Sequence, residues 1–174
     1  MPFTKKAFKS AFIEALEKHG LTIYFNRNDH FVLANGKDSN RIISVKLVCS
    51  KKIDQSVHGS HNNNKLDGIG HFKFFIPKAE DQIDYIAFAF QNTIDQEIEF
   101  VIVPDAVLRN RFQNQNRNPT GAKKAEITLW LMAERFVYEA PFSIESEWFF
   151  LSSGTGGRMA DGTDMDYSEF LNNW

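Results

Sequence analysis

The sequence predicts a single α+β domain with a central mixed β-sheet and an N-terminal helix packed on one face. One amphipathic segment opens the chain, and several short runs of β-branched and aromatic residues follow it. The chain has 174 residues, of which 43% are hydrophobic and 24% are charged, a balance typical of a globular protein that buries its own core. No internal repeat and no linker divides it, so we expect one domain over residues 1–174.

The helix is expected over Lys5–Lys18, because its apolar residues recur every four positions and form one stripe. That stripe consists of Phe8, Phe12 and Leu16, with Ala11 and Ala15 beside it. Thr4 is a suitable N-cap residue. Gly20 follows the last helical turn and can adopt the left-handed conformation that ends a helix.

Strands are expected where β-branched and aromatic residues cluster, at 21–25, 31–33, 41–49, 71–76, 84–90, 99–104, 136–138 and 147–151. Asn35 and Gly36 form a strong tight-turn signal. Asp84–Phe90 is apolar almost throughout, which predicts an interior strand covered on both faces. Ile127–Met132 fits a strand or a helix equally well.

Two further helices are expected late in the chain. Asp105 follows a proline that ends a strand and can cap a helix, which we expect to dissolve into the polar stretch 110–119. Asp166–Glu169 has the spacing of a capping box and predicts a short last helix to Trp174.

Charge is distributed unevenly, although the net charge is only -2 and the pI is about 6.2. Residues 1–60 carry ten Lys and Arg against five Asp and Glu, whereas residues 123–174 carry four against nine. This split allows one basic face on a nearly neutral protein. Nucleic-acid binding does not follow from it, because domains that bind mainly through charge usually have a high pI.

Composition also excludes several classes of protein. A single cysteine, Cys49, rules out a disulfide framework and a four-cysteine zinc site, and its position at the end of an apolar run favours an inert thiol. The longest apolar runs are too short to span a bilayer, so we expect no membrane partner. Without a signal-peptide pattern at the start, we expect a cytoplasmic, bacterial protein.

Two groups of possible metal ligands are weaker candidates. The imidazoles of His58, His61 and His71 with the Asp67 carboxylate could bind zinc or a related ion, but surface histidines in a long polar loop explain them better. The acidic residues over 161–169 lack the glycine of a calcium loop and fit a solvated, helix-capping segment. The glycines at 154–157 lack the spacing of a dinucleotide-binding loop.

A basic stretch follows the helix expected at Asp105. No acidic residue occurs between Ala106 and Ala125, while asparagine and glutamine separate five cations. Those cations are Arg109, Arg111, Arg117, Lys123 and Lys124. Arginine can contact phosphate with two hydrogen bonds, so the stretch is a candidate for binding DNA or RNA. The alternative is a solvated loop with no partner.

The order of elements over residues 5–112 resembles that of the PD-(D/E)XK nuclease superfamily. The resemblance rests on a helix, a β-meander ending in Val45 and Lys46, and later strands over 71–76, 84–90 and 99–104. The superfamily core is a helix, a three-stranded antiparallel unit, a helix and a further strand. The resemblance implies a restriction-endonuclease-like core and a metal-dependent nuclease.

The resemblance also implies site residues. In this superfamily an Asp, and an acid two residues before a Lys, bind a divalent metal, Mg²⁺ or Mn²⁺, that activates water. Lys46 matches the lysine, and Asp38 or Asp29 matches the first Asp. Ser44 stands where the second acid is expected, and strand alternation places it on the same face as Lys46.

The missing acid leaves the metal site incomplete. Glu14 or Glu17 on the first helix could supply a migrated carboxylate, so that Asp38 and Glu14 would hold the metal. The alternative is that Lys46 is a structural lysine on a solvent-exposed face. Because a single carboxylate rarely holds Mg²⁺, we expect cleavage to be weak or absent.

Two functions fit these features of the sequence. The first is a nucleic-acid-associated protein with a nuclease-like fold, either catalytically inactive or a metal-dependent nuclease with an incomplete motif. The second is a non-enzymatic protein-interaction domain of a bacterial or phage accessory protein, whose many phenylalanines meet a protein partner. Lys46 beside Asp38 or Asp29 in a basic groove favours the first, and an apolar patch beside an isolated Lys46 favours the second.

Overall fold

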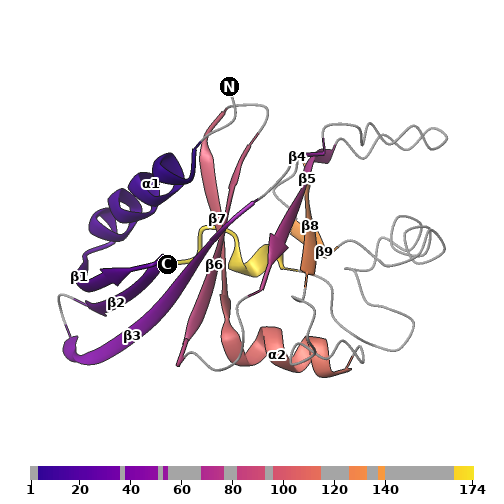
Figure 1. Ribbon diagram of the computed structural model, residues 1–174. Helices are drawn as coiled ribbons and strands as arrows, with labels where there is room; N and C mark the ends of the chain where they lie inside the picture. The colour runs from indigo at the N-terminus through magenta and orange to yellow at the C-terminus, as the bar shows by residue number, and fades with distance from the viewer. Residues whose placement is uncertain are drawn as a thin grey trace, which may run out of the picture.

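The computed structural model has an α+β architecture in which two sheets and one long helix pack in layers (Figure 1). It describes residues 4–35, 38–50, 53–54, 68–76, 82–92, 96–114, 126–132, 137–139 and 167–174. Neither of the two α-helices in these ranges is long and apolar enough to cross a membrane.

The first helix, α1, spans Lys5–Lys18, as the apolar periodicity predicts. The Thr4 hydroxyl accepts a hydrogen bond from the Ala7 N–H at 3.3 Å, which satisfies one of the donors left over in the first turn. Gly20 ends the helix with a φ of +73°, in the region that glycine enters without strain. The stripe of Phe8, Phe12 and Leu16 is buried against the larger sheet.

The larger sheet is mixed and has five strands in the order β1-β2-β3-β6-β7. Its strands are β1 (Leu21–Arg27), β2 (His30–Asn35), β3 (Asp38–Cys49), β6 (Tyr85–Gln91) and β7 (Ile98–Pro104). The pair β3 and β6 is parallel, and the other neighbours are antiparallel. The predicted mixed sheet with a helix on one face is confirmed.

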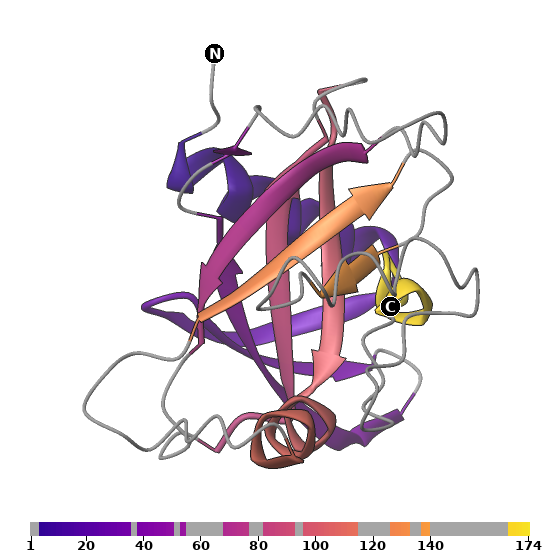
Figure 2. The same cartoon turned by 90° about the vertical axis from the view of Figure 1, so that its right-hand side faces the viewer.

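A second, antiparallel sheet was not anticipated from the sequence. It consists of β4 (Ile53–Asp54), β5 (Gly68–Phe75), β8 (Glu126–Met132) and β9 (Val137–Glu139), in the order β4-β5-β8-β9. Figure 2 shows β5 and β8 crossing in front of β6 and β7. The segment that fitted either a strand or a helix is therefore strand β8, and it pairs with β5 along its whole length.

The interior strand β6 separates two hydrophobic cores. Ala87 and Ala89 face the core under α1, while Phe88 and Phe90 face the second sheet. On that side Phe90 lies 4.6 Å from Phe72 between ring centroids, and Phe88 lies 4.9 Å from Phe74. The interior strand predicted from the apolar run is confirmed, and its two covers are a helix and a sheet.

The two later helices differ from expectation. The second α-helix, α2, begins at Asp105 as predicted but continues to Asn114, further into the polar stretch than expected. In place of a helix reaching Trp174, there is a 3-10 turn, η1, over Ser168–Phe170. Leu171 then forms a bridge to β7, and the Asn172 N–H donates to the Phe100 carbonyl at 2.7 Å. These sheet-like contacts replace the helical ones.

Several sequence predictions fall outside the described residues. They are the turn glycine Gly36, the loop histidines His58 and His61, Asp67, the strand at 147–151, and the glycines at 154–157.

The core under α1 supplies a stability prediction. Phe12 is fully buried, and its ring centroid lies 5.0 Å from Phe31, 5.3 Å from Phe100 and 5.6 Å from Trp174. Phe12→Ala should lower the free energy of unfolding by ~3–5 kcal/mol, because it removes these contacts and leaves a cavity.

The matched control is Phe25→Ala, because the Phe25 side chain is 48% exposed. It should change the free energy of unfolding by less than about 1 kcal/mol. Urea unfolding followed by circular dichroism measures both values. Equal losses in the two variants would contradict the assignment of Phe12 to the core.

Candidate nucleic-acid interface

A two-residue turn between β1 and β2 organises the candidate site. Asn28 and Asp29 both have positive φ, of 52° and 63°. Asn and Asp tolerate this conformation better than other residues with a Cβ, and hairpins with two-residue turns require it. The turn pairs Arg27 with His30 across the hairpin.

Strand register then places three nitrogen-bearing side chains in one line. Arg27 is opposite His30, and His30 is opposite Lys46 on β3. Residues directly opposite each other in a sheet point to the same face. We call Arg27, His30 and Lys46 the basic row.

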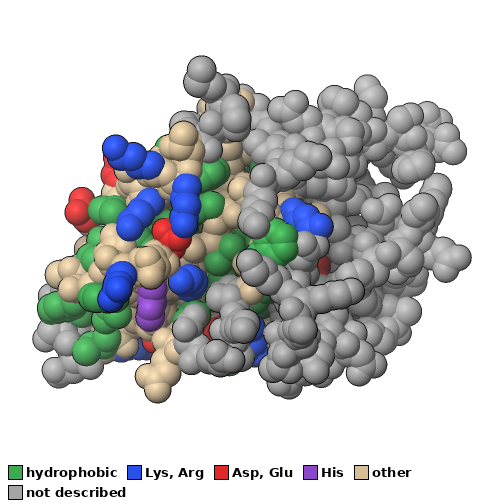
Figure 3. All heavy atoms as spheres, in the orientation of Figure 1, with side chains coloured by type: hydrophobic (Ala, Val, Ile, Leu, Met, Phe, Trp, Pro, Cys, Tyr) green, Lys and Arg blue, Asp and Glu red, His purple; other side chains and the backbone are tan. Residues whose placement is uncertain are grey.

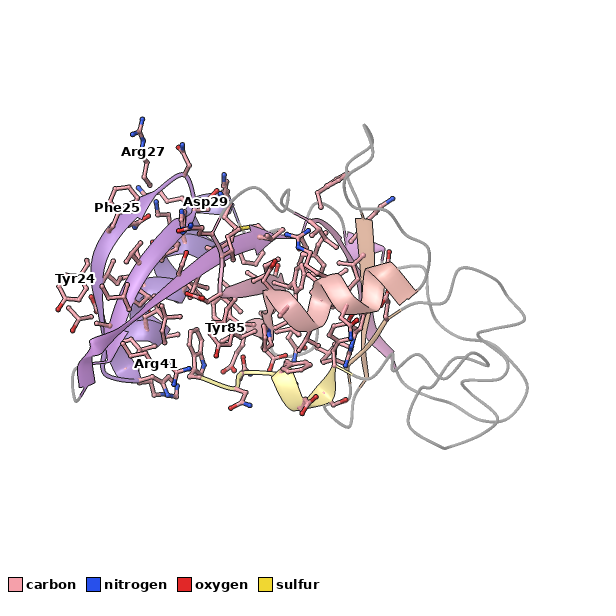
Figure 4. All side chains as sticks on the ribbon, turned by 90° about the horizontal axis from the view of Figure 1, so that it is seen from below. Tyr24, Phe25, Arg27, Asp29, Arg41 and Tyr85 are labelled. Atoms are coloured by element: carbon pink, nitrogen blue, oxygen red, sulfur yellow. The ribbon has the colours of Figure 1, made fainter. Side chains whose placement is uncertain are left out.

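The basic row lies on the side of β1–β3 away from α1, which we call the outer face. Val45 and Leu47 belong to the core under α1, so Lys46 between them points the other way. In Figure 1, α1 lies above β1–β3, and Figure 4 views the molecule from below. The predicted shared face of Ser44 and Lys46 agrees with this alternation.

Hydrogen bonds connect the outer face to the turn and to β6. The Lys46 Nζ donates to the Asn28 carbonyl at 2.9 Å. His30 Nε2 and the Ser44 Oγ share a hydrogen bond of 2.5 Å. The exposed Asp84 carboxylate accepts from the Ser44 N–H at 2.7 Å, and the Asp84 N–H donates to the Ser44 carbonyl. These contacts hold Ser44 and Lys46 in fixed positions.

Asp29 lies at the same turn as Lys46, but its carboxylate has a different partner. It pairs with the Lys5 ammonium on α1, which raises the pKa of Lys5 above its ordinary value. The Asp29 backbone carbonyl accepts from the Leu47 N–H at 2.8 Å. The structure therefore brings Asp29 near Lys46 through the backbone and directs the carboxylate to the helix.

The other expected metal ligands do not join Lys46. Glu14 and Glu17 are exposed on α1, and the sheet lies between that helix and the outer face. From this position neither glutamate can place the expected migrated carboxylate beside Lys46. Asp38 is the first residue of β3, and its side chain lies outside the described part. Among the described residues no three His, Cys, Asp or Glu side chains form a group that could hold a metal ion.

The arginines expected to bind nucleic acid at α2 are used within the fold. The Arg109 guanidinium pairs with Asp105, with Nη2 3.0 Å from Oδ1. Arg111 is buried, and its guanidinium lies 4.2 Å from the centre of the Tyr167 ring. These partners give both residues a structural role. The three remaining cations of that stretch, Arg117, Lys123 and Lys124, lie outside the described residues.

Exposed aromatic residues stand beside the basic row, and the sequence analysis did not identify them. The side chains of Tyr24 and Phe25 on β1 are 64% and 48% exposed, and that of Ile42 on β3 is 66% exposed. Figure 4 shows Tyr24, Phe25 and Arg27 along the outer edge of the sheet. The polar break at 26–30 was the available signal, because reading it as a two-residue turn fixes the register of the hairpin.

Further cations lie on α1, where Figure 3 shows Lys and Arg side chains gathered on the surface. The helix carries Lys5, Lys6, Lys9 and Lys18. They account for part of the positive charge of residues 1–60, and they lie across the sheet from the basic row.

The chain matches no family model, no curated protein and no solved structure.

The cysteine beside the Asp29–Lys5 pair tests where the Asp29 carboxylate lies. Burial raises the pKa of the Cys49 thiol from the ordinary 9.0 to about 11; the Asp29 charge adds to the rise and the Lys5 charge opposes it. Asp29→Asn should lower this pKa, because it removes a negative charge and leaves Lys5 close by. Thiolate absorbance against pH measures the change.

The matched control is Asp84→Asn, which removes a carboxylate on the other side of β3 and should leave the thiol pKa unchanged.

The raised pKa of Cys49 also means that the folded state keeps its thiol proton to a higher pH than the unfolded state. Cys49 should therefore reduce stability progressively as the pH rises from about 9 to about 11. An equal shift of the Cys49 thiol pKa in Asp29→Asn and Asp84→Asn would place the Asp29 carboxylate away from Cys49.

Proposed function

We propose that this protein associates with nucleic acid and binds its phosphate backbone on the outer face of β1–β3. The observation that carries the proposal is the basic row, in which Arg27, His30 and Lys46 stand opposite one another on three adjacent strands. Its two cations, Arg27 and Lys46, stand on either side of His30 and can contact neighbouring phosphates.

Both cations of the row retain the capacity to bind an anion. Lys46 donates one hydrogen bond to the Asn28 carbonyl, and an ammonium has three donors. Arg27 is exposed, and a guanidinium can meet a phosphate with two parallel hydrogen bonds.

The resemblance to PD-(D/E)XK nucleases supports the proposal in part. Helix α1, the antiparallel unit β1–β3 and the added strand β6 follow the order of that core. The described residues between β3 and β6 depart from it, because they form β4 and β5 of the second sheet where the superfamily has a helix. The nuclease-like fold is thus part of the proposal.

The proposed function does not include catalysis. Ser44 occupies the position of the second acid, and its hydroxyl is bonded to His30. The Asp29 carboxylate is paired with Lys5. A site for Mg²⁺ or Mn²⁺ would need carboxylates beside Lys46, and of those that the resemblance implies only Asp38 is still a candidate.

Binding should depend on the basic row and on salt. Arg27→Ala and Lys46→Ala should each weaken binding of a DNA duplex, to a similar degree for every sequence tested. Each should also reduce the slope of log Kd against log salt by about 1, because one fewer counterion is released. Fluorescence anisotropy over a salt series measures both effects.

The control for this series is Lys18→Ala, which removes an exposed cation of α1 on the opposite side of the sheet. It should leave the affinity and the salt slope unchanged. A chain that binds no DNA or RNA at low salt would refute the proposal, and so would an affinity that does not depend on salt.

Cleavage of DNA or RNA with Mg²⁺ or Mn²⁺ should be weak or absent, because Lys46 lacks the neighbouring acid. If cleavage occurs, Lys46→Ala should abolish it, since the ammonium stabilises charge that develops on the attacked phosphate. A gel assay on labelled strands measures this. Strong metal-dependent cleavage that survives Lys46→Ala would rule out any nuclease site at this position.

A protein partner is the second candidate. The exposed side chains of Tyr24, Phe25 and Ile42 are the kind of apolar surface expected to favour it, and the Asp29 carboxylate, expected beside Lys46 for the first candidate, pairs with Lys5 instead. Apolar side chains gathered on one surface are typical of interaction sites. Sedimentation velocity would detect association of the chain with itself through this surface. A protein interaction would depend on these three side chains and would tolerate the loss of Arg27 or Lys46.

A further inference from the structure

We propose that the outer face selects single-stranded nucleic acid, with bases stacked on Phe25 and Tyr24 while the phosphates contact the basic row. This inference rests on the proposed function and adds the class of nucleic acid. It starts from an irregularity in β1, where the pairing with β2 shifts by one residue.

The irregularity is a β-bulge at Tyr24. Ile23 pairs with Leu33, but the next pair joins Phe25 to Val32, so Tyr24 is an extra residue on its strand. Regular alternation would place Phe25 on the side of Ile23, which packs in the core under α1. The bulge instead places Phe25 opposite Val32, and Val32 is opposite Ser44 on β3. Phe25 therefore lies on the outer face with Ser44 and Lys46.

The same register puts the aromatic ring next to the cations. Phe25 and Arg27 are two residues apart on one face of β1, a spacing of ~7 Å along a strand. A single nucleotide can therefore rest its base on Phe25 and direct its phosphate to Arg27. The exposed Ile42 on β3 adds a further apolar contact on the sheet.

Among the described residues, Tyr24, Phe25 and Ile42 are the large hydrophobic side chains that remain exposed, and all three belong to β1–β3. Aromatic rings on an open sheet surface are the usual platform for unpaired bases. In a duplex the bases are already stacked on one another and cannot reach Phe25. A duplex would contact only the basic row, and it would therefore bind more weakly.

The experiment compares two probes on the full chain at one salt concentration. The probes are a labelled mixed-sequence 20-mer DNA strand and the duplex made from it. Anisotropy should give a dissociation constant at least about tenfold lower for the single strand, since base–aromatic stacking contributes a gain of this order for each base. A 20-mer of abasic deoxyribose phosphate should bind as weakly as the duplex.

Variants separate stacking from charge. Phe25→Ala and Phe25→Leu should both weaken single-strand binding about tenfold, because a leucine keeps the apolar bulk without the ring. Neither should change duplex binding. Arg27→Ala should weaken binding of both probes. Phe25→Leu guards against a folding defect, and thermal melts of each variant verify the fold.

The outcomes distinguish the inference from the function on which it rests. Equal affinity for the two probes would overturn the single-strand inference and leave nucleic-acid binding intact, as would single-strand binding that is unchanged in both Phe25 variants. Binding of neither probe at low salt would overturn both. Self-association lost in Phe25→Ala, without binding of either probe, would assign the surface to a protein partner.

Discussion

Burial of β6 on both faces is the constraint on which the rest of the structure depends. Small side chains at Ala87 and Ala89 let α1 approach the sheet closely on one side. Large rings at Phe88 and Phe90 interlock with the second sheet on the other. The backbone N–H and C=O groups of a strand buried on both faces cannot reach water, so β6 needs a paired strand on each side, and β3 and β7 fill these places.

The outer face is accessible because the second sheet covers only part of its side of the larger sheet. The second sheet packs on Ile86, Phe88 and Phe90 of β6 and on β7, and those residues form one hydrophobic core. On the same side of β1–β3, the side chains of Phe25 and Ile42 remain exposed. The edge of the second sheet thus divides a buried half of the larger sheet from an accessible half, and the candidate interface occupies the accessible half.

Local patterns predicted the elements whose formation depends on neighbouring residues. The bounds of α1 follow from a four-residue apolar period with Thr4 and Gly20 at its ends. The common face of Ser44 and Lys46 follows from strand alternation alone. Long-range pairing was not predictable in this way. Whether β5 joins β3 or β8 depends on contacts between distant segments, which periodicity does not encode.

The candidate site shows the same limit. Arg111 lies in a basic stretch that is typical of a nucleic-acid contact, yet its guanidinium packs on Tyr167, a residue far along the chain. The bulge at Tyr24 is a property of the β1–β2 register, and the sequence of β1 by itself reads as regular alternation. The sequence analysis named Lys46 as a candidate and did not name Arg27, because the hairpin turn that aligns them was read only as a polar break.

The packing of Trp174 has a consequence for how the protein folds during synthesis. Its indole contacts Phe12 and Phe100 and stacks on the His19 ring, so the core under α1 includes residues separated by most of the chain. A ribosome releases α1 and β1–β3 long before Trp174 is made. Until then Phe12 lacks one of its aromatic neighbours, and the nascent chain must keep that apolar surface from aggregating while translation continues.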